Sequence, residues 1–138
     1  MAHHSITAKH SGGMSFSSDL DGHTVIIDLG HAGGGNDTGP RPKALMLISL
    51  AGCTGVDVVE ILNKMRVKFS ELSIHVQGDL TDVVPKTYHT VTITYKIKVV
   101  KEDEPKVQKA VLLSQDKYCG VSAMFRAFCT LKTAIVYI

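Results

Sequence analysis

The stretch Pro40–Arg66, which reads PRPKALMLISLAGCTGVDVVEILNKMR, organises this chain. From Ala44 to Val56 it contains no charged residue. A helix that is apolar on every side is typical of a protein interior. A membrane span would need roughly 18–25 apolar residues in a row, and Asp57 ends this run too early. We therefore predict that the stretch forms a buried core helix.

Cys53 lies in the middle of this predicted helix, between Gly52 and Gly55. A glycine inside a helix costs about 1 kcal/mol relative to alanine. Two glycines around a cysteine therefore indicate that another backbone or a small ligand comes close to the thiol. The alternative is that Cys53 only fills space, as most buried cysteines do.

The size and composition are those of one globular domain. The chain has 138 residues, of which 44% are hydrophobic, and a net charge of +2. We predict a single domain over residues 1–138, with residues 1–4 either disordered or derived from a tag. No basic cluster indicates nucleic-acid binding. An odd number of cysteines (three) and the lack of a secretory segment favour the cytoplasm.

The N-terminal part predicts short strands and a glycine-rich loop. Strands are expected between Ser5 and Leu29, with Asp21-Gly22 as a hairpin turn. The loop Gly30–Gly39 lacks the Gly-Lys-Ser/Thr ending of a phosphate-binding loop. We interpret it as a mobile connection at the mouth of the site that the central helix carries.

Alternating residues after the central helix predict a sheet. Apolar residues alternate with polar ones in Leu72–Val76 and in Val91–Val99. This period of two predicts one apolar and one wet face, as in an antiparallel sheet covered by helices on one side. His75 and His89 fall on the polar side, so we expect both at the surface rather than as ligands.

The C-terminal part predicts two helical segments and a strand. The residues Lys101–Pro105 form a loop that leads into the first helix. A second helical segment is expected to begin near Ser114 and to continue through Cys119 to Cys129. The residues Thr133–Ile138 are β-branched enough to form a closing strand.

Cys119 is the second cysteine with a chemical environment of interest. It lies near a predicted helix N-terminus and beside Lys117, and both features favour the thiolate. Cys129 follows about 15 Å further along the same helix, too far for a disulfide with Cys119, so we expect it in the core. If the two helices pack together, Cys53 and Cys119 could open and close as a disulfide.

Other classes of site find little support in the sequence. There is no Cys-x-x-Cys or His-x-x-x-His pair for zinc, and no Gly-x-Ser-x-Gly for a serine hydrolase. We therefore predict neither a metal nor a cofactor.

Two cysteine motifs resemble those of the OsmC/Ohr family. The first comprises Gly39-Pro40-Arg41-Pro42, Leu50-Ala51-Gly52-Cys53 and Asp57-Val58-Val59, and the second is Asp116-Lys117-Tyr118-Cys119-Gly120-Val121-Ser122. Gly12-Gly13-Met14 and Asp21-Gly22-His23 are similar to the YhfA-like branch of the family.

This resemblance implies an α+β fold, in which antiparallel sheets wrap around long central helices of an intertwined homodimer. It implies a peroxidase acting on organic hydroperoxides in oxidative-stress defence. Cys53 would attack the peroxide and become a sulfenic acid, and Cys119 would resolve it as a disulfide. The implied partners are a second copy of the chain, a small hydroperoxide and a dithiol reductant, with no nucleic acid and no membrane.

One departure from the family pattern concerns activation of the thiol. Lys43 stands where the peroxidase branches carry a glutamate, and no arginine precedes Arg41 to pair with one. Cys53 also lies roughly 16 Å into its helix, beyond reach of the N-terminal dipole. Substitute cations would be Arg41, Lys43 or Lys117, and Asp57 could accept a proton or a hydrogen bond.

Three functional hypotheses remain open. The first is the hydroperoxide peroxidase. The second is a dimer without catalytic activity that binds a small apolar or thiol-bearing ligand or acts as a redox sensor, which the missing glutamate–arginine pair favours. The third is zinc binding or a purely structural role.

Overall fold

The computed structural model describes residues 2–138, so of the predicted N-terminal segment 1–4 only Met1 lies outside the described residues. The chain divides into two compact units, one that ends at Met46 and one over Leu47–Ile138. A single domain over residues 1–138 stays a prediction.

The first unit contains a small antiparallel sheet. Its strands are β1 (Ala8–His10), β2 (Phe16–Leu20) and β3 (His23–Ile27), in that order across the sheet. Asp21 and Gly22, between β2 and β3, have φ angles of 53° and 78°. A two-residue hairpin turn with both φ angles positive matches the twist of the strands that it joins. The predicted short strands and the hairpin turn are confirmed.

The glycine-rich loop is organised around the carboxylate of Asp28. This carboxylate accepts hydrogen bonds from the amides of Leu29, Asn36 and Thr38 and, at 2.7 Å, from the hydroxyl of Thr38. These bonds, with the Thr38 hydroxyl first, lower the pKa of Asp28 to about 2. The loop that we interpreted as a mobile connection is therefore tied to a buried side chain of its own unit.

The second unit contains a mixed sheet. It consists of β4 (Ser70–Leu80), β5 (Tyr88–Lys98) and β6 (Thr130–Tyr137), with β5 in the centre. The strands β4 and β5 are antiparallel as predicted, whereas β6 runs parallel to β5. A parallel neighbour needs a crossover connection, and the helices between β5 and β6 provide it. The closing strand begins three residues earlier than Thr133, where we expected it.

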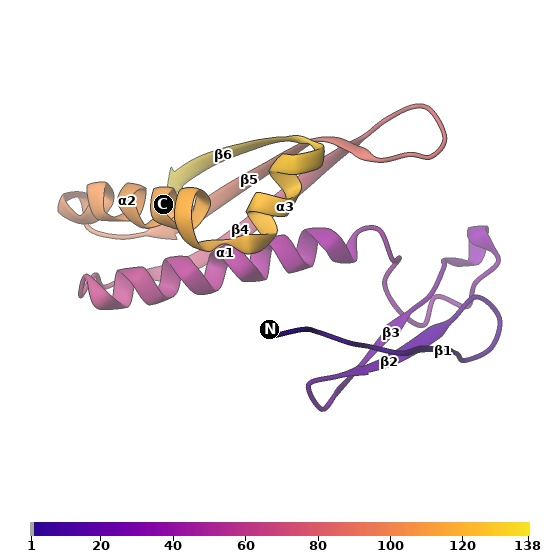
Figure 1. Ribbon diagram of the computed structural model, residues 1–138. Helices are drawn as coiled ribbons and strands as arrows, with labels where there is room; N and C mark the ends of the chain where they lie inside the picture. Colours follow the sequence, from indigo (N-terminus) through magenta and orange to yellow (C-terminus); the bar gives the residue numbers. More distant parts are fainter. Residues whose placement is uncertain (1) are drawn as a thin grey trace. The chain divides into compact units, whose positions relative to one another are not determined.

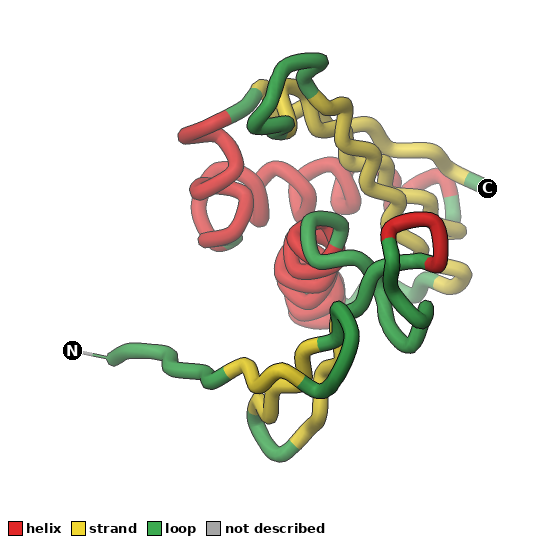
Figure 2. The backbone as a smooth tube through the Cα atoms, turned by 90° about the vertical axis from the view of Figure 1, so that its right-hand side faces the viewer, coloured by secondary structure: helices red, strands yellow, loops and turns green. Residues whose placement is uncertain are grey.

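Helices cover one face of this sheet, as Figures 1 and 2 show from two directions. They are α1 (Leu45–Lys64), α2 (Glu104–Leu113) and α3 (Gly120–Phe128). The second unit also has the short helical turns η2 (Lys101–Asp103) and η3 (Ser114–Tyr118), and the first unit has one, η1 (His31–Gly33). The core lies between the sheet and the helical layer, and its fully buried members include Leu50, Val58, Leu62, Val91, Ile93, Tyr95, Ile97 and Ala110. The predicted division into an apolar and a wet sheet face is confirmed.

The prediction that α1 is buried on all sides is wrong for the single chain. Its buried residues form one stripe, Leu50, Thr54, Val58 and Leu62. On the opposite face Ile48 is 63% and Val56 67% exposed. By length and hydropathy alone α1 could cross a membrane, and 22% of its most apolar 18-residue window is buried. One sheet in one chain can cover only one side of a helix.

The continuous helix expected from Ser114 to Cys129 is interrupted at Cys119. The turn η3 is a π-helix, whose backbone hydrogen bonds span one residue more than those of an α-helix. Cys119 then has an extended backbone with φ −76° and ψ 100°, and α3 begins at Gly120. This interruption turns Cys119 from a residue inside a helix into the N-cap of a new one.

Candidate functional site

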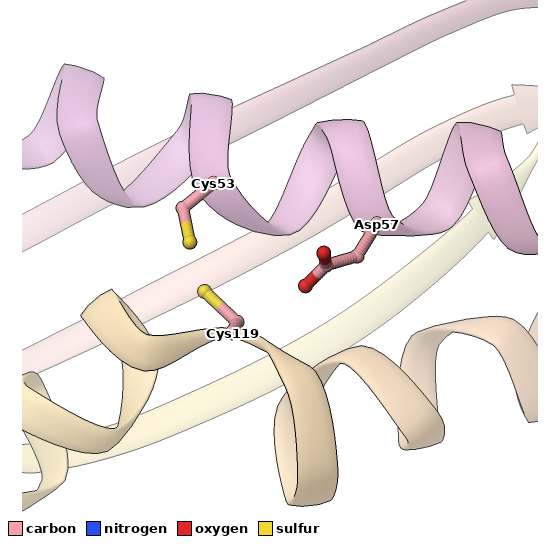
Figure 3. A group of neighbouring side chains, drawn as sticks. All are labelled: Cys53, Asp57 and Cys119. Atoms are coloured by element: carbon pink, nitrogen blue, oxygen red, sulfur yellow. The ribbon is translucent and has the colours of Figure 1, made fainter. Parts of the chain in front are cut away.

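The structure brings Cys53, Asp57 and Cys119 together. Their two sulfurs and a carboxylate oxygen all lie within 4.8 Å of one another. Figure 3 shows the two thiols facing each other between α1 and the start of α3, with the carboxylate turned toward them. Cys119 is 3% exposed, whereas Cys53 is only partly buried. The structure therefore brings the predicted cysteine pair together, although its catalytic roles stay a prediction.

Local structure explains this convergence. Cys53 and Asp57 are four residues apart on α1, so that they lie on the same face one turn apart. Cys119 caps α3, and its sulfur accepts the amide N–H of Ser122 at 3.3 Å. The amide of Val121 donates to Cys53. Two free amides of a helix N-terminus therefore face the two sulfurs, a position that favours negative charge.

Other influences oppose ionisation of Cys53. Burial raises the pKa of its thiol, and the hydrogen bond with Cys119 raises it further. The charge of Asp57 acts in the same direction, and only the amide of Val121 lowers the pKa. The net effect raises the pKa of Cys53, so the surroundings disfavour its thiolate.

A chain of buried hydrogen bonds ends at Asp57. Ser114 donates to Oδ2 of Asp57 at 3.0 Å, and its oxygen lies 2.7 Å from that of Thr54. Thr54 lies 2.6 Å from the hydroxyl of Tyr95, which accepts from the amide of Gln115 at 2.9 Å. A hydroxyl has one proton, and an ionised carboxylate only accepts. The hydroxyl of Thr54 must therefore donate to Ser114, and the hydroxyl of Tyr95 must donate to Thr54.

Arg126 holds the far end of this hydrogen-bonded chain. Its guanidinium donates to the backbone oxygen of Gln115 at 2.7 Å and to Oε1 of the same residue at 3.4 Å. All donors thus point from a cation toward Asp57, and the three hydroxyl-bearing residues between them are fully buried. In such a network each bond polarises the next.

Sequence reasoning missed this network. Thr54 interrupts an apolar helix, and Tyr95 brings a hydroxyl into an apolar strand face. A buried hydroxyl needs a partner, so these two residues were the available signal. Ser122 differs: its buried Oγ has no hydrogen-bond partner among residues 2–138.

A cleft of about 360 Å³ opens beside Asp57. Its lining is mixed: Ile61, Met65 and Leu113 are apolar, whereas Glu60, Lys64 and Tyr118 carry polar groups. The cleft provides an approach for a small molecule to the carboxylate next to the cysteine pair.

The other predicted residues lie as follows. The Nζ of Lys117 lies 5.2 Å from the ring centre of Tyr118. Arg41 bonds Asp37 at 2.5 Å within the first unit, to which Lys43 also belongs. Cys129 packs partly buried against the hydrophobic core, as predicted.

The expectation that another backbone comes close to the Cys53 thiol is confirmed, since the amide of Val121 donates to it, but Gly52 and Gly55 do not provide the room for this approach. A methyl group placed at Gly52 would meet no described atom within 4 Å. At Gly55 it would meet the Cδ1 of Ile74 at 2.9 Å, which is a side chain of the sheet. The backbone that does approach Cys53 is that of Val121 in α3.

The same three residues could also hold a metal ion. Two sulfurs and a carboxylate oxygen suit a zinc-like cation. No short sequence motif contains Cys53, Asp57 and Cys119 together, because Cys119 lies at the start of α3 and the other two residues lie on α1. The spacing of four between Cys53 and Asp57 was the only local signal.

Comparisons with known proteins identify relatives of this chain. The family model described as OsmC-like protein matches residues 34–134. The chain is 26% identical to Protein YhfA of Escherichia coli K12 over 113 residues, which cover 81% of each chain. The structure of a protein from Aquifex aeolicus VF5 is 28% identical, with a TM-score of 0.86 over 100% of this chain and 98% of that one.

A more distant structural neighbour is an organic hydroperoxide resistance protein, OsmC, from Legionella pneumophila. It is 16% identical, with a TM-score of 0.68 over 99% of both chains. At this identity the likeness shows the α+β fold alone.

Proposed function

Since the chain belongs to the OsmC-like protein family, we propose that it is a thiol-dependent peroxidase that reduces organic hydroperoxides through Cys53 and Cys119. The observation that carries this proposal is the meeting of both sulfurs at the N-terminus of α3. The Legionella protein, whose name refers to organic hydroperoxide resistance, adds support by analogy. The role that we propose is defence against oxidative stress.

The first step is attack by Cys53. Its thiolate attacks one oxygen of the hydroperoxide, an S–O bond forms, and the O–O bond breaks. The departing alkoxide takes up the proton that the thiol lost, so the products are a sulfenic acid and an alcohol. The greater exposure of Cys53 supports this assignment, because Cys119 is 3% exposed.

The second step is resolution by Cys119. Its sulfur attacks the sulfur of the sulfenic acid, a disulfide forms and water leaves. The two thiols require little movement, since they already lie within 4.8 Å. A dithiol reductant then restores the pair by thiol–disulfide exchange.

One observation favours a second candidate function. The pKa of Cys53 is raised, first by burial and also by the charge of Asp57. A thiol that ionises reluctantly reacts slowly, which suits a module that binds a small apolar or thiol-bearing ligand.

We propose further that the protein is an intertwined homodimer of the cytoplasm. The exposed face of α1 forms an apolar groove with Ile48, Gly52 and Val56 beside Ile74 of β4. Large exposed apolar patches mark interaction sites, and a second copy of the chain is the occupant that the family likeness suggests.

Counting free thiols tests the peroxidase. Reduced protein would be treated with one equivalent of cumene hydroperoxide in the presence of a metal chelator. We expect the loss of two thiols per chain, recovered by a dithiol, and the same loss in Cys129→Ser. Cys119→Ser should instead trap a sulfenic acid, and Cys53→Ser should consume no peroxide. If the wild-type protein loses no thiol, the peroxidase proposal is wrong.

A further inference from the structure

We propose that Cys53, Asp57 and Cys119 form a binding site for a thiophilic divalent cation, with zinc as the expected ion. This function goes beyond the peroxidase and does not depend on it. Its basis is the arrangement of three ligand atoms and of the groups that hold them.

The geometry of the ligand atoms fits zinc. The two sulfurs and the carboxylate oxygen lie within 4.8 Å of one another. In a tetrahedral site with Zn–S bonds of about 2.3 Å, two sulfurs are about 3.8 Å apart. Cys53 and Asp57 lie one turn apart on α1 and Cys119 caps the facing helix, so the atoms that would bind zinc already lie within about 1 Å of the required separation.

Each ligand is held by a hydrogen bond to a fixed group. Ser114 donates to Oδ2 of Asp57 and leaves Oδ1 available. The amide of Ser122 donates to the sulfur of Cys119 at 3.3 Å, and the amide of Val121 donates to Cys53. Metal ligands are commonly oriented by partners of this kind. The buried hydrogen bonds from Tyr95 through Thr54 to Ser114 keep the hydroxyl proton of Ser114 directed at Asp57.

The ionisable groups of Cys53, Asp57 and Cys119 also favour a bound cation. The ion pairs among residues 2–138 are Arg41–Asp37, Lys64–Glu60 and Lys106–Asp103, and none of them includes Asp57. Arg126 bonds Gln115 instead. Three groups that can each carry a negative charge thus converge without an ion-pair partner, and a divalent ion would balance them.

Metal binding and disulfide formation use the same sulfur electron pairs and therefore exclude each other. Zinc displaces both thiol protons when it binds. Oxidation by a hydroperoxide would take two electrons from the two thiolates and form the disulfide. The hydroperoxide and two protons would become an alcohol and water, and the zinc ion would leave.

Cobalt(II) reports this site directly, because a cobalt–thiolate bond absorbs in the near ultraviolet and a cobalt–imidazole bond does not. The reduced, metal-free full chain would be titrated with Co²⁺ and then with Zn²⁺. We expect one cobalt ion per chain with a thiolate charge-transfer band, which zinc abolishes. Cys129→Ser should retain the band at full intensity.

The remaining variants identify the ligands. The double variant Cys53→Ser/Cys119→Ser should lose the band, and Asp57→Asn should weaken Co²⁺ binding at least about tenfold. The proposal fails if wild-type protein shows no band, if the double variant keeps it, or if Asp57→Asn binds as tightly as wild type. Circular dichroism establishes that each variant is folded.

The two proposals can fail separately. Protein that binds zinc but loses no thiol to the hydroperoxide contradicts the peroxidase alone. Protein that loses two thiols but gives no cobalt–thiolate band contradicts the metal site alone.

Discussion

Ser114 donates a 3.0 Å hydrogen bond to Asp57, a residue 57 positions earlier in the chain. The bond joins the turn η3 to the middle of α1, next to the cysteine pair. It is also the last link of the buried chain that runs from Arg126 through Gln115.

Tyr95→Phe should destabilise the protein by about 1–3 kcal/mol, because it removes a buried hydroxyl and with it one hydrogen bond of Thr54 and one of Gln115. Urea unfolding followed by circular dichroism measures the change. Tyr118→Phe is the matched control, since Tyr118 is 53% exposed, and it should change the free energy of unfolding by less than about 0.5 kcal/mol. Equal effects of both substitutions would show that the buried hydrogen bonds of Tyr95 do not contribute to stability.

The reactivity of Cys53 should increase only at alkaline pH. Its pKa is raised, first by burial and also by the charge of Asp57, so the thiolate forms above the ordinary range of a cysteine. Alkylation by iodoacetamide, followed by mass spectrometry of the Cys53 peptide in a chelating buffer, gives the pH profile.

Asp57→Asn should shift this alkylation profile of Cys53 to lower pH, because the substitution removes a nearby negative charge. Asp116→Asn, which changes an exposed carboxylate, should leave the profile unchanged. A profile that stays in place in Asp57→Asn would show that its charge does not act on Cys53.

Val56→Glu should convert a dimer into a monomer. Val56 is 67% exposed on the apolar face of α1, and a glutamate there would bring two charges into the proposed interface. Sedimentation velocity measures the mass in solution. Val136→Glu places the same charge on β6, where the side chain is 41% exposed, and should leave the dimer intact. A wild-type monomer would contradict the proposed interface.

Acid should loosen the loop of the first unit at unusually low pH. The pKa of Asp28 is lowered from 3.8 to about 2, chiefly by the Thr38 hydroxyl. Because the folded pKa lies below the ordinary one, the carboxylate stabilises the loop above pH 3.8 and ceases to do so as the pH falls through about 2. The carboxyl carbon resonance of Asp28 should titrate accordingly.

Thr38→Val should raise the pKa of Asp28 toward 3.8, because it deletes the hydroxyl that is the largest cause of the lowered value. Thr24→Val, which removes the hydroxyl that bonds Asp19, is the control. If the Asp28 resonance titrates at an ordinary pH in the wild type, the loop is not organised as described.

Much of the fold could be predicted from local pattern. Alternation over Val91–Val99 identified β5 and its buried face, and Asp21-Gly22 identified the hairpin. The direction of β6 could not be predicted, because a strand's own residues do not reveal whether its neighbour is parallel. The exposure of α1 also escaped prediction, since apolar residues look alike whether they face a core or a partner.

The candidate site was predicted in part. The pairing of Cys53 with Cys119 followed from motif resemblance, and the structure places them together. The chain from Arg126 to Asp57 depends on long-range contacts among Thr54, Tyr95 and Ser114, which no periodicity encodes. The break at Cys119 likewise needed coordinates, because the residues of the π-turn η3 are ordinary helix formers.

The π-helical turn η3 fixes the number of residues between α2 and Cys119. Successive residues of an α-helix are rotated by about 100° and advance by 1.5 Å. Deleting one residue between Ser114 and Tyr118 would allow an ordinary helical turn there and swing the sulfur of Cys119 away from α1. Length variation should therefore be poorly tolerated in these five positions and well tolerated in the exposed hairpin tip at residues 82–86.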